Sequence, residues 1–127
     1  MSDRFTLGTS LEHSWPVHEA LTVRAHGTID IPVLATPHLI FMLEDTCVLA
    51  VQPLLAAGEI TVGTCVHIDH LAAARVGQHV AVRADLISVR GRRLMFRVEG
   101  RCGKTVIGRG LHERAVVDAQ AFLATLA

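Results

Sequence analysis

The feature that most constrains the fold is one long apolar segment in the first half of the chain, ATPHLIFMLEDTCVLAVQPLLAA. Thr36 followed by Pro37 favours a helix start, because Thr can cap free backbone N–H groups and Pro suits the first helical turn. Apolar side chains then recur at the spacing of a mostly buried helix, at Leu39, Ile40, Leu43, Cys47, Val48, Val51, Leu54 and Leu55. We expect a helix from about Pro37 to Ala57, kinked or ended early by Pro53 and closed by Gly58.

Two titratable side chains stand where apolar residues are expected. Glu44 lies inside the apolar stripe of the helix, where a carboxylate must be paired, hydrogen-bonded or protonated. The next segment, Glu59 to Leu71, predicts a strand that ends near His70. Strict alternation would place His70 on one face with Ile60, Val62, Thr64, Val66 and Ile68. Glu44 and His70 are therefore the first candidates for a functional site.

The remaining segments alternate between apolar and polar residues, as strands with one buried face do. The predicted strands run from Leu11 to Pro16, His79 to Val89, Leu94 to Val98 and Lys104 to Val117, with a short extended piece over Ala20–Ala25 and a closing helix from Asp118 to Leu126. We read this order as a strand, the long helix and four strands in a meander. The helix is the only element that can cover the apolar face of such a sheet. The sequence therefore predicts an α+β hotdog fold, an antiparallel sheet of about five strands around a long central helix, with a short C-terminal helix.

Composition narrows the class of protein. The 127 residues suit a single domain spanning 1–127, and half of them are hydrophobic. Twelve basic residues balance twelve acidic ones, so the net charge gives no reason to expect binding to nucleic acid or to an anionic membrane. Three cysteines, at spacings that match no disulfide or zinc framework, indicate a reducing compartment, and the first residues lack the layout of a signal peptide. The apolar run Ile31–Val51 is interrupted by charged residues and makes a poor membrane span. We expect a cytoplasmic protein.

Several blocks resemble the hotdog-fold thioesterases, and most closely the fluoroacetyl-CoA thioesterase-like subgroup. They are AT at 35–36, MLEDTC at 42–47, VGTCVHIDH at 62–70, SVRGRRLMFRV at 88–98 and GLHERAVV at 110–117. The resemblance implies that Thr36, Glu44 and His70 are the catalytic residues. It also places the backbone of Gly63 near the thioester and Arg114 near the entrance to the active site.

The function that this resemblance implies is hydrolysis of a small acyl-CoA thioester, with coenzyme A as part of the substrate and no separate cofactor or metal. Backbone amides near Gly63 and at the helix N-terminus would stabilise the oxyanion. Fluoroacetate-specific members carry an aromatic lid before the helix, whereas this chain has no phenylalanine between Phe5 and Phe41. A different or broader acyl group is therefore expected. The sequence does not define the length of the acyl chain. It also does not define whether the acyl group is carried by coenzyme A or by protein-bound pantetheine.

Each candidate residue also has a simpler interpretation. Glu44 could activate water, attack directly, or only pair with an arginine. His70 could orient Glu44, protonate the leaving thiolate, or be a solvent-facing residue at a strand end. Thr36 could be a nucleophile, a hydrogen-bonding partner or an N-cap. Gly63 could admit a ligand or mark a bulge.

Helix geometry bears on how the site is assembled. Eight residues of helix rise about 12 Å, so Thr36 and Glu44 of one chain should not touch. Either an acyl group bridges the two residues, or the site takes some members from a second subunit. We expect the second arrangement, a homodimer with active sites at the subunit interface. The basic side chains of Arg90, Arg92, Arg93 and Arg114 could meet the phosphates of coenzyme A or simply be solvated. The competing functions are a non-catalytic hotdog module that binds acyl-CoA and, third, a hotdog dehydratase.

Overall fold

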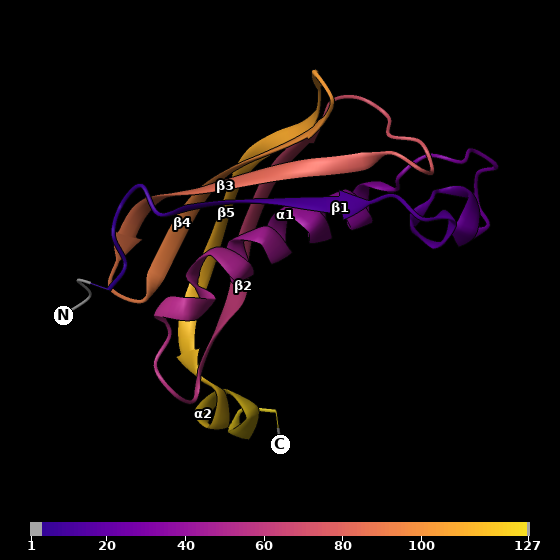
Figure 1. Ribbon diagram of the computed structural model, residues 1–127. Helices are drawn as coiled ribbons and strands as arrows, with labels where there is room; N and C mark the ends of the chain where they lie inside the picture. Colours follow the sequence, from indigo (N-terminus) through magenta and orange to yellow (C-terminus); the bar gives the residue numbers. More distant parts are fainter. Residues whose placement is uncertain (1–3, 127) are drawn as a thin grey trace.

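The computed structural model describes residues 4–126, which form one antiparallel sheet curved around a long helix (Figure 1). The strands are β1 (Ser10–Pro16), β2 (Glu59–His70), β3 (His79–Arg90), β4 (Arg93–Cys102) and β5 (Thr105–Asp118). The helices are α1 (Thr36–Val51) and α2 (Ala119–Ala124), with single 3-10 turns η1 (Glu19–Leu21), η2 (Arg24–His26) and η3 (Gln52–Leu54). The order of strands in the sheet is β1-β3-β4-β5-β2. The predicted hotdog architecture is confirmed.

The core lies between α1 and the concave face of the sheet. Its fully buried side chains come from one face of α1 and from alternate positions of β3 and β4; they include Leu39, Leu43, Cys47, Val51, Val80, Val82, Ala84, Leu86, Leu94, Phe96 and Val98. Alternation in the sequence predicted the inward positions of β3 and β4 correctly. Burying each large aliphatic or aromatic side chain contributes on the order of 1.5–3 kcal/mol, so this contact fixes α1 on the sheet.

The strands are not connected as one meander of four, and that prediction was wrong. Only β3, β4 and β5 follow one another; β2 pairs with β5 at the far edge, and β1 pairs with β3 at the other. The connection from Leu71 to Gln78 carries the chain from β2 to β3 past β5 and β4. Eight residues span three strand spacings, about 14 Å, with ease, whereas a tight hairpin would have kept β2 and β3 adjacent.

Two boundaries before and after α1 also differ from the prediction. The segment Ala20–Ala25 is not extended but contains parts of the turns η1 and η2, which are closed by short-range backbone bonds. The helix ends at Val51, before η3, rather than continuing to Ala57. Pro53 explains the early end, because it cannot donate the next helical hydrogen bond. Gly58, at φ +82°, belongs to the turn that leads into β2.

The short helix α2 follows β5 as expected. Its N-cap is Asp118, whose carboxylate accepts a 2.9 Å hydrogen bond from the amide of Ala121. Within residues 4–126, no helix is long and apolar enough to cross a membrane.

Candidate active site

A break in β2 determines which of its side chains face the helix. The pairing with β5 shifts between Gly63 and Cys65, so Thr64 is a β-bulge. Before the bulge Ile60 and Val62 face away from α1; after it the alternation is reversed. The predicted single face from Ile60 to His70 was therefore wrong, since one extra residue moves every later side chain to the other face.

The residues that face α1 are Thr61 and Gly63 before the bulge and Val66, Ile68 and His70 after it. Their neighbours on β5 are His112 opposite Val66, Gly110 opposite Ile68 and Gly108 opposite His70. The bulge thus allows both Gly63 and His70 to lie on the concave face, where each meets a side chain of α1.

The first such pair is Thr36 and His70. Thr36 begins α1 and His70 ends β2, and the Thr36 Oγ1 atom lies 2.7 Å from His70 Nδ1. The N-cap position belongs to Ala35, which provides no side-chain hydrogen bond. Of the interpretations left open for Thr36, the N-cap is wrong, because the hydroxyl is hydrogen-bonded to the His70 imidazole instead.

The second pair is Glu44 and Gly63. Glu44 projects from the middle of α1 and keeps a third of its side chain exposed. A Cβ atom built on Gly63 would lie only 2.9 Å from Glu44 Oε2, so the strand backbone and the carboxylate are in close contact. Of the two interpretations of Gly63, the bulge is confirmed, since Gly63 borders it; the contact with Glu44 leaves the approach of a ligand a prediction.

Two β5 side chains lie behind the carboxylate. Arg114 Nη1 and His112 Nε2 are each 3.6 Å from Glu44 Oε2. Arg114 is only 7% exposed, and it donates from Nε to Thr61 Oγ1 and from Nη2 to the Thr61 carbonyl oxygen, each at 2.8 Å. Burial lowers the pKa of Arg114, and the charge of Glu44 acts against that shift. Arg114 thus lies beneath Glu44 with its guanidinium held by β2.

His112 is a site residue that sequence reasoning missed. It is 1% exposed, and its two ring nitrogens contact the Cys65 carbonyl oxygen at 2.8 Å and Arg114 Nη1 at 3.1 Å. Burial, followed by the charge of Arg114, lowers its pKa below the usual value, although the Cys65 carbonyl and Glu44 act in the opposite direction. The available signal was its position two residues before Arg114, which puts both on one face of β5.

The two pairs do not meet within one chain. Thr36 and Glu44 are separated by eight residues of α1, a rise of about 12 Å. His70 contacts Thr36, whereas Glu44 lies beside Gly63, nearer the start of β2, and beside Arg114 of β5. The chain therefore presents two separate groups of polar residues, here called half-sites, on the side of α1 that faces β2.

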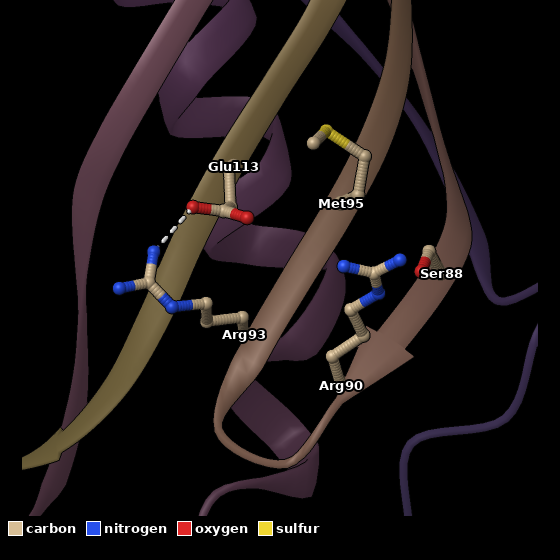
Figure 2. A pocket seen from close by; sticks show the side chains of 5 residues that line it. All are labelled: Ser88, Arg90, Arg93, Met95 and Glu113. Carbon is tan, nitrogen blue, oxygen red and sulfur yellow. Dashed lines mark hydrogen bonds and ion pairs between the residues drawn. The ribbon is translucent and has the colours of Figure 1, made fainter.

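The other candidate arginines lie elsewhere. Arg90 and Arg93 line a hollow of about 270 Å³ together with Ser88, Met95 and Glu113 (Figure 2). Arg93 forms a 2.8 Å ion pair with Glu113, whose neighbours along β5, His112 and Arg114, point to Glu44 on the opposite face. This hollow is thus on the convex side of the sheet, away from both half-sites. Within residues 4–126, no three His, Cys, Asp or Glu side chains are placed to hold a metal ion.

A curved antiparallel sheet around one long helix defines a hotdog fold, and comparison with known proteins gives the class, a hotdog-fold thioesterase. The family model described as "Fluoroacetyl-CoA-specific thioesterase" matches residues 17–120. A curated fluoroacetyl-CoA thioesterase from Streptantibioticus cattleyicolor is 38% identical over 129 residues, covering 96% of this chain and 92% of the relative. The chain belongs to the fluoroacetyl-CoA-specific thioesterase family, a family of thioester hydrolases.

Solved structures agree with this assignment. A structure of the fluoroacetyl-CoA thioesterase superposes with a TM-score of 0.90 at 37% identity, covering 96% of this chain and 95% of the other. A hot-dog-like protein from Thermanaerovibrio acidaminovorans also reaches a TM-score of 0.90, at 21% identity and with 99% and 95% coverage. The second likeness shows the fold alone.

Proposed function

We propose that this chain hydrolyses small acyl-CoA thioesters, with Glu44, His70 and Thr36 as its catalytic residues. The observation that carries the proposal is the placement of Glu44: a carboxylate that is one-third exposed, lies against the backbone of Gly63 and has the buried guanidinium of Arg114 3.6 Å away. Gly63 leaves room beside the carboxylate, and the exposed third of the Glu44 side chain leaves it open to a ligand. Membership of the family supports the same reaction class.

In the proposed reaction, the thioester carbonyl lies beside Gly63. Glu44 either takes a proton from a water molecule that attacks the carbonyl carbon, or attacks that carbon itself, in which case loss of the thiolate leaves an anhydride that water then opens. The carbonyl oxygen becomes an oxyanion and accepts hydrogen bonds from backbone amides near Gly63 and at the start of α1. The C–S bond then breaks, and His70, oriented by Thr36, protonates the departing thiolate. The products are a carboxylic acid and free coenzyme A.

We further propose that the active sites form between the subunits of a homodimer. Each chain supplies Glu44 in one half-site and the Thr36–His70 pair in the other, and these lie too far apart along α1 to act together within one chain. Phe41 on α1 is 55% exposed, and Val66 on the inner face of the edge strand β2 is 39% exposed. Apolar surface of this kind beside an edge strand supports burial against a second copy. Sedimentation velocity would test the dimer; a monomer at micromolar concentration would contradict it.

The substrate proposal is a small acyl group other than fluoroacetyl. It rests on the segment between η1 and α1, which has no phenylalanine, where fluoroacetate-specific members are expected to carry an aromatic lid. Cytoplasmic location is proposed on the three cysteines, which are free thiols in the structure.

The reaction class is tested by measuring thiol release from a panel of short, branched and aromatic acyl-CoA esters. Wild type should release thiol from at least one ester, and Glu44→Ala should lose that activity while keeping its melting temperature. A matched control is Glu99→Gln, which removes a carboxylate paired with Arg101 on the convex face and should retain activity. If wild type binds coenzyme A yet hydrolyses nothing, the alternative of a non-catalytic acyl-CoA-binding module replaces this proposal. Conversion of a 3-hydroxyacyl thioester to its enoyl form without hydrolysis would indicate a dehydratase.

A further inference from the structure

The imidazole of His112 is buried with both nitrogens engaged, and the proposed reaction gives it no part. Nδ1 lies 2.8 Å from the carbonyl oxygen of Cys65, which can only accept, so Nδ1 carries the proton. Nε2 lies 3.1 Å from Arg114 Nη1, which can only donate, so Nε2 is the acceptor. The ring is therefore neutral and held in one tautomer by two neighbouring strands.

Arg114 is held from three directions. Its Nε and Nη2 atoms donate to Thr61, and its Nη1 atom donates to His112. Nη1 is also the guanidinium nitrogen that faces Glu44 Oε2. The lone pair of His112 thus fixes the one nitrogen of Arg114 that meets the carboxylate.

We propose that His112 is a positioning residue for Glu44: its neutral ring holds Arg114 Nη1 beside the carboxylate, and protonation of the ring releases that hold. The inference rests on the proposed function, because it assigns the orientation of the proposed catalytic carboxylate to a residue that does not touch the substrate. A protonated ring has no lone pair at Nε2 and places a second positive charge 3.1 Å from a guanidinium nitrogen.

The charges around His112 define the direction of the pH effect. Arg114 and Glu113 act on it from β5 and Glu44 from α1, while β2 contributes the Cys65 carbonyl. Burial is the largest influence and, with Arg114, keeps the ring neutral to lower pH than an ordinary histidine. The hydrogen bond between Arg114 Nη1 and His112 is thus present at neutral pH and is lost on acidification. Protonation of His112 therefore contributes to the fall of activity on the acidic side of the pH profile, the acid limb.

Two substitutions divide the functions of the ring. In His112→Gln the longer side chain brings an amide oxygen to the place of Nε2, so it still accepts from Arg114 but cannot titrate. In His112→Asn the shorter amide can still donate to the Cys65 carbonyl and leaves Arg114 without an acceptor. We expect the Asn variant to lose about tenfold in kcat, since an arginine hydrogen bond is lost, with KM unchanged. We expect the Gln variant to retain most of kcat and to shift its acid limb to lower pH.

Equal kcat in the two variants, or an acid limb that the Gln variant leaves unchanged, would overturn the proposal. Melting curves identify a variant that fails to fold. If the Asn variant fails to fold, the acid limb of the Gln variant alone tests the proposal. Nitrogen-15 NMR of His112 and carbon-13 titration of the Glu44 carboxyl give readouts that need no activity. An Nδ1–H tautomer, and a Glu44 titration that changes in His112→Asn, would support the positioning role even if no acyl-CoA were hydrolysed. A charged ring at neutral pH, or an unchanged Glu44 titration, would refute it.

Discussion

The substitution Gly63→Ala should displace the Glu44 carboxylate with little effect on the fold. The new Cβ would lie 2.9 Å from Glu44 Oε2, 3.3 Å from His112 Cε1 and 3.4 Å from Arg114 Nη1. The first distance is far inside ordinary contact, so the carboxylate must move by about half an ångström or more. Errors of about 1 Å in the placement of a reacting group lower rates on the order of a hundredfold. We therefore expect kcat/KM to fall roughly 10- to 100-fold.

Stability should change much less. The atom that must move is the end of a flexible, partly exposed side chain, and Gly63 is not among the glycines at positive φ. Alanine also restricts the unfolded chain, which offsets part of the strain by about 0.4–1 kcal/mol. The melting temperature should stay within about 5 °C of wild type.

The assay is steady-state thiol release with the best acyl-CoA ester, together with thermal melting of each variant. The matched control is Gly100→Ala, whose Cβ would lie 3.0 Å from Val80 Cγ1 and would have apolar core side chains as its three nearest neighbours. This control should lower the melting temperature and leave kcat/KM unchanged at a temperature where the protein is folded. Unaltered kcat/KM in Gly63→Ala would refute the view that close contact with the β2 backbone sets the position of Glu44.

Three further predictions follow from other contacts. Thr36→Val removes the hydroxyl bound to His70 and should lower kcat about tenfold or more, whereas Thr36→Ser should retain most of it; equal loss in both would argue against the hydroxyl. The Arg4 guanidinium, with the Ala56 amide, lowers the pKa of Glu59 to about 2. This pair stabilises the fold above about pH 4.5 and loses its effect as the pH falls towards 2, so melting temperatures of wild type and Glu59→Gln should converge in acid; a constant difference would contradict the pairing. Burial raises the pKa of the Cys47 thiol to about 12, so iodoacetamide at pH 8 should label it only after unfolding; mass spectrometry showing labelling of the folded protein would contradict this.

Local patterns in the sequence predicted α1 and the inward faces of β3 and β4, because periodicity alone decides which side of such elements is buried. They left a bulge at Gly63 as one alternative, but they did not predict that Thr64 forms it and reverses the faces of β2. The residues around it, from Ile60 to Ile68, are apolar enough on both faces that either register fits the sequence. The place of β2 beside β5 was equally hidden, since strand pairing depends on contacts distant in the chain.

The sequence likewise predicted some residues of the candidate site and not others. A carboxylate within the apolar stripe of a helix indicated Glu44, and the resemblance to thioesterases added Thr36, His70, Gly63 and Arg114. His112 was not found, because a histidine that alternates with an arginine on a strand is typical of a solvent-facing edge. Only the approach of Glu44 from α1 shows that this face is buried.

The measurement that tests the account most directly is complementation between two inactive variants. Equal amounts of Glu44→Ala and His70→Ala are mixed, dissociated and reassembled, and thiol release is measured before and after. If each active site combines Glu44 of one subunit with Thr36 and His70 of the other, half of the dimers are mixed and each holds one intact site. Activity should then return to about a quarter of wild type. If reassembled dimers stay inactive while a wild-type control recovers fully, the half-sites act within one chain and the shared-site account is contradicted.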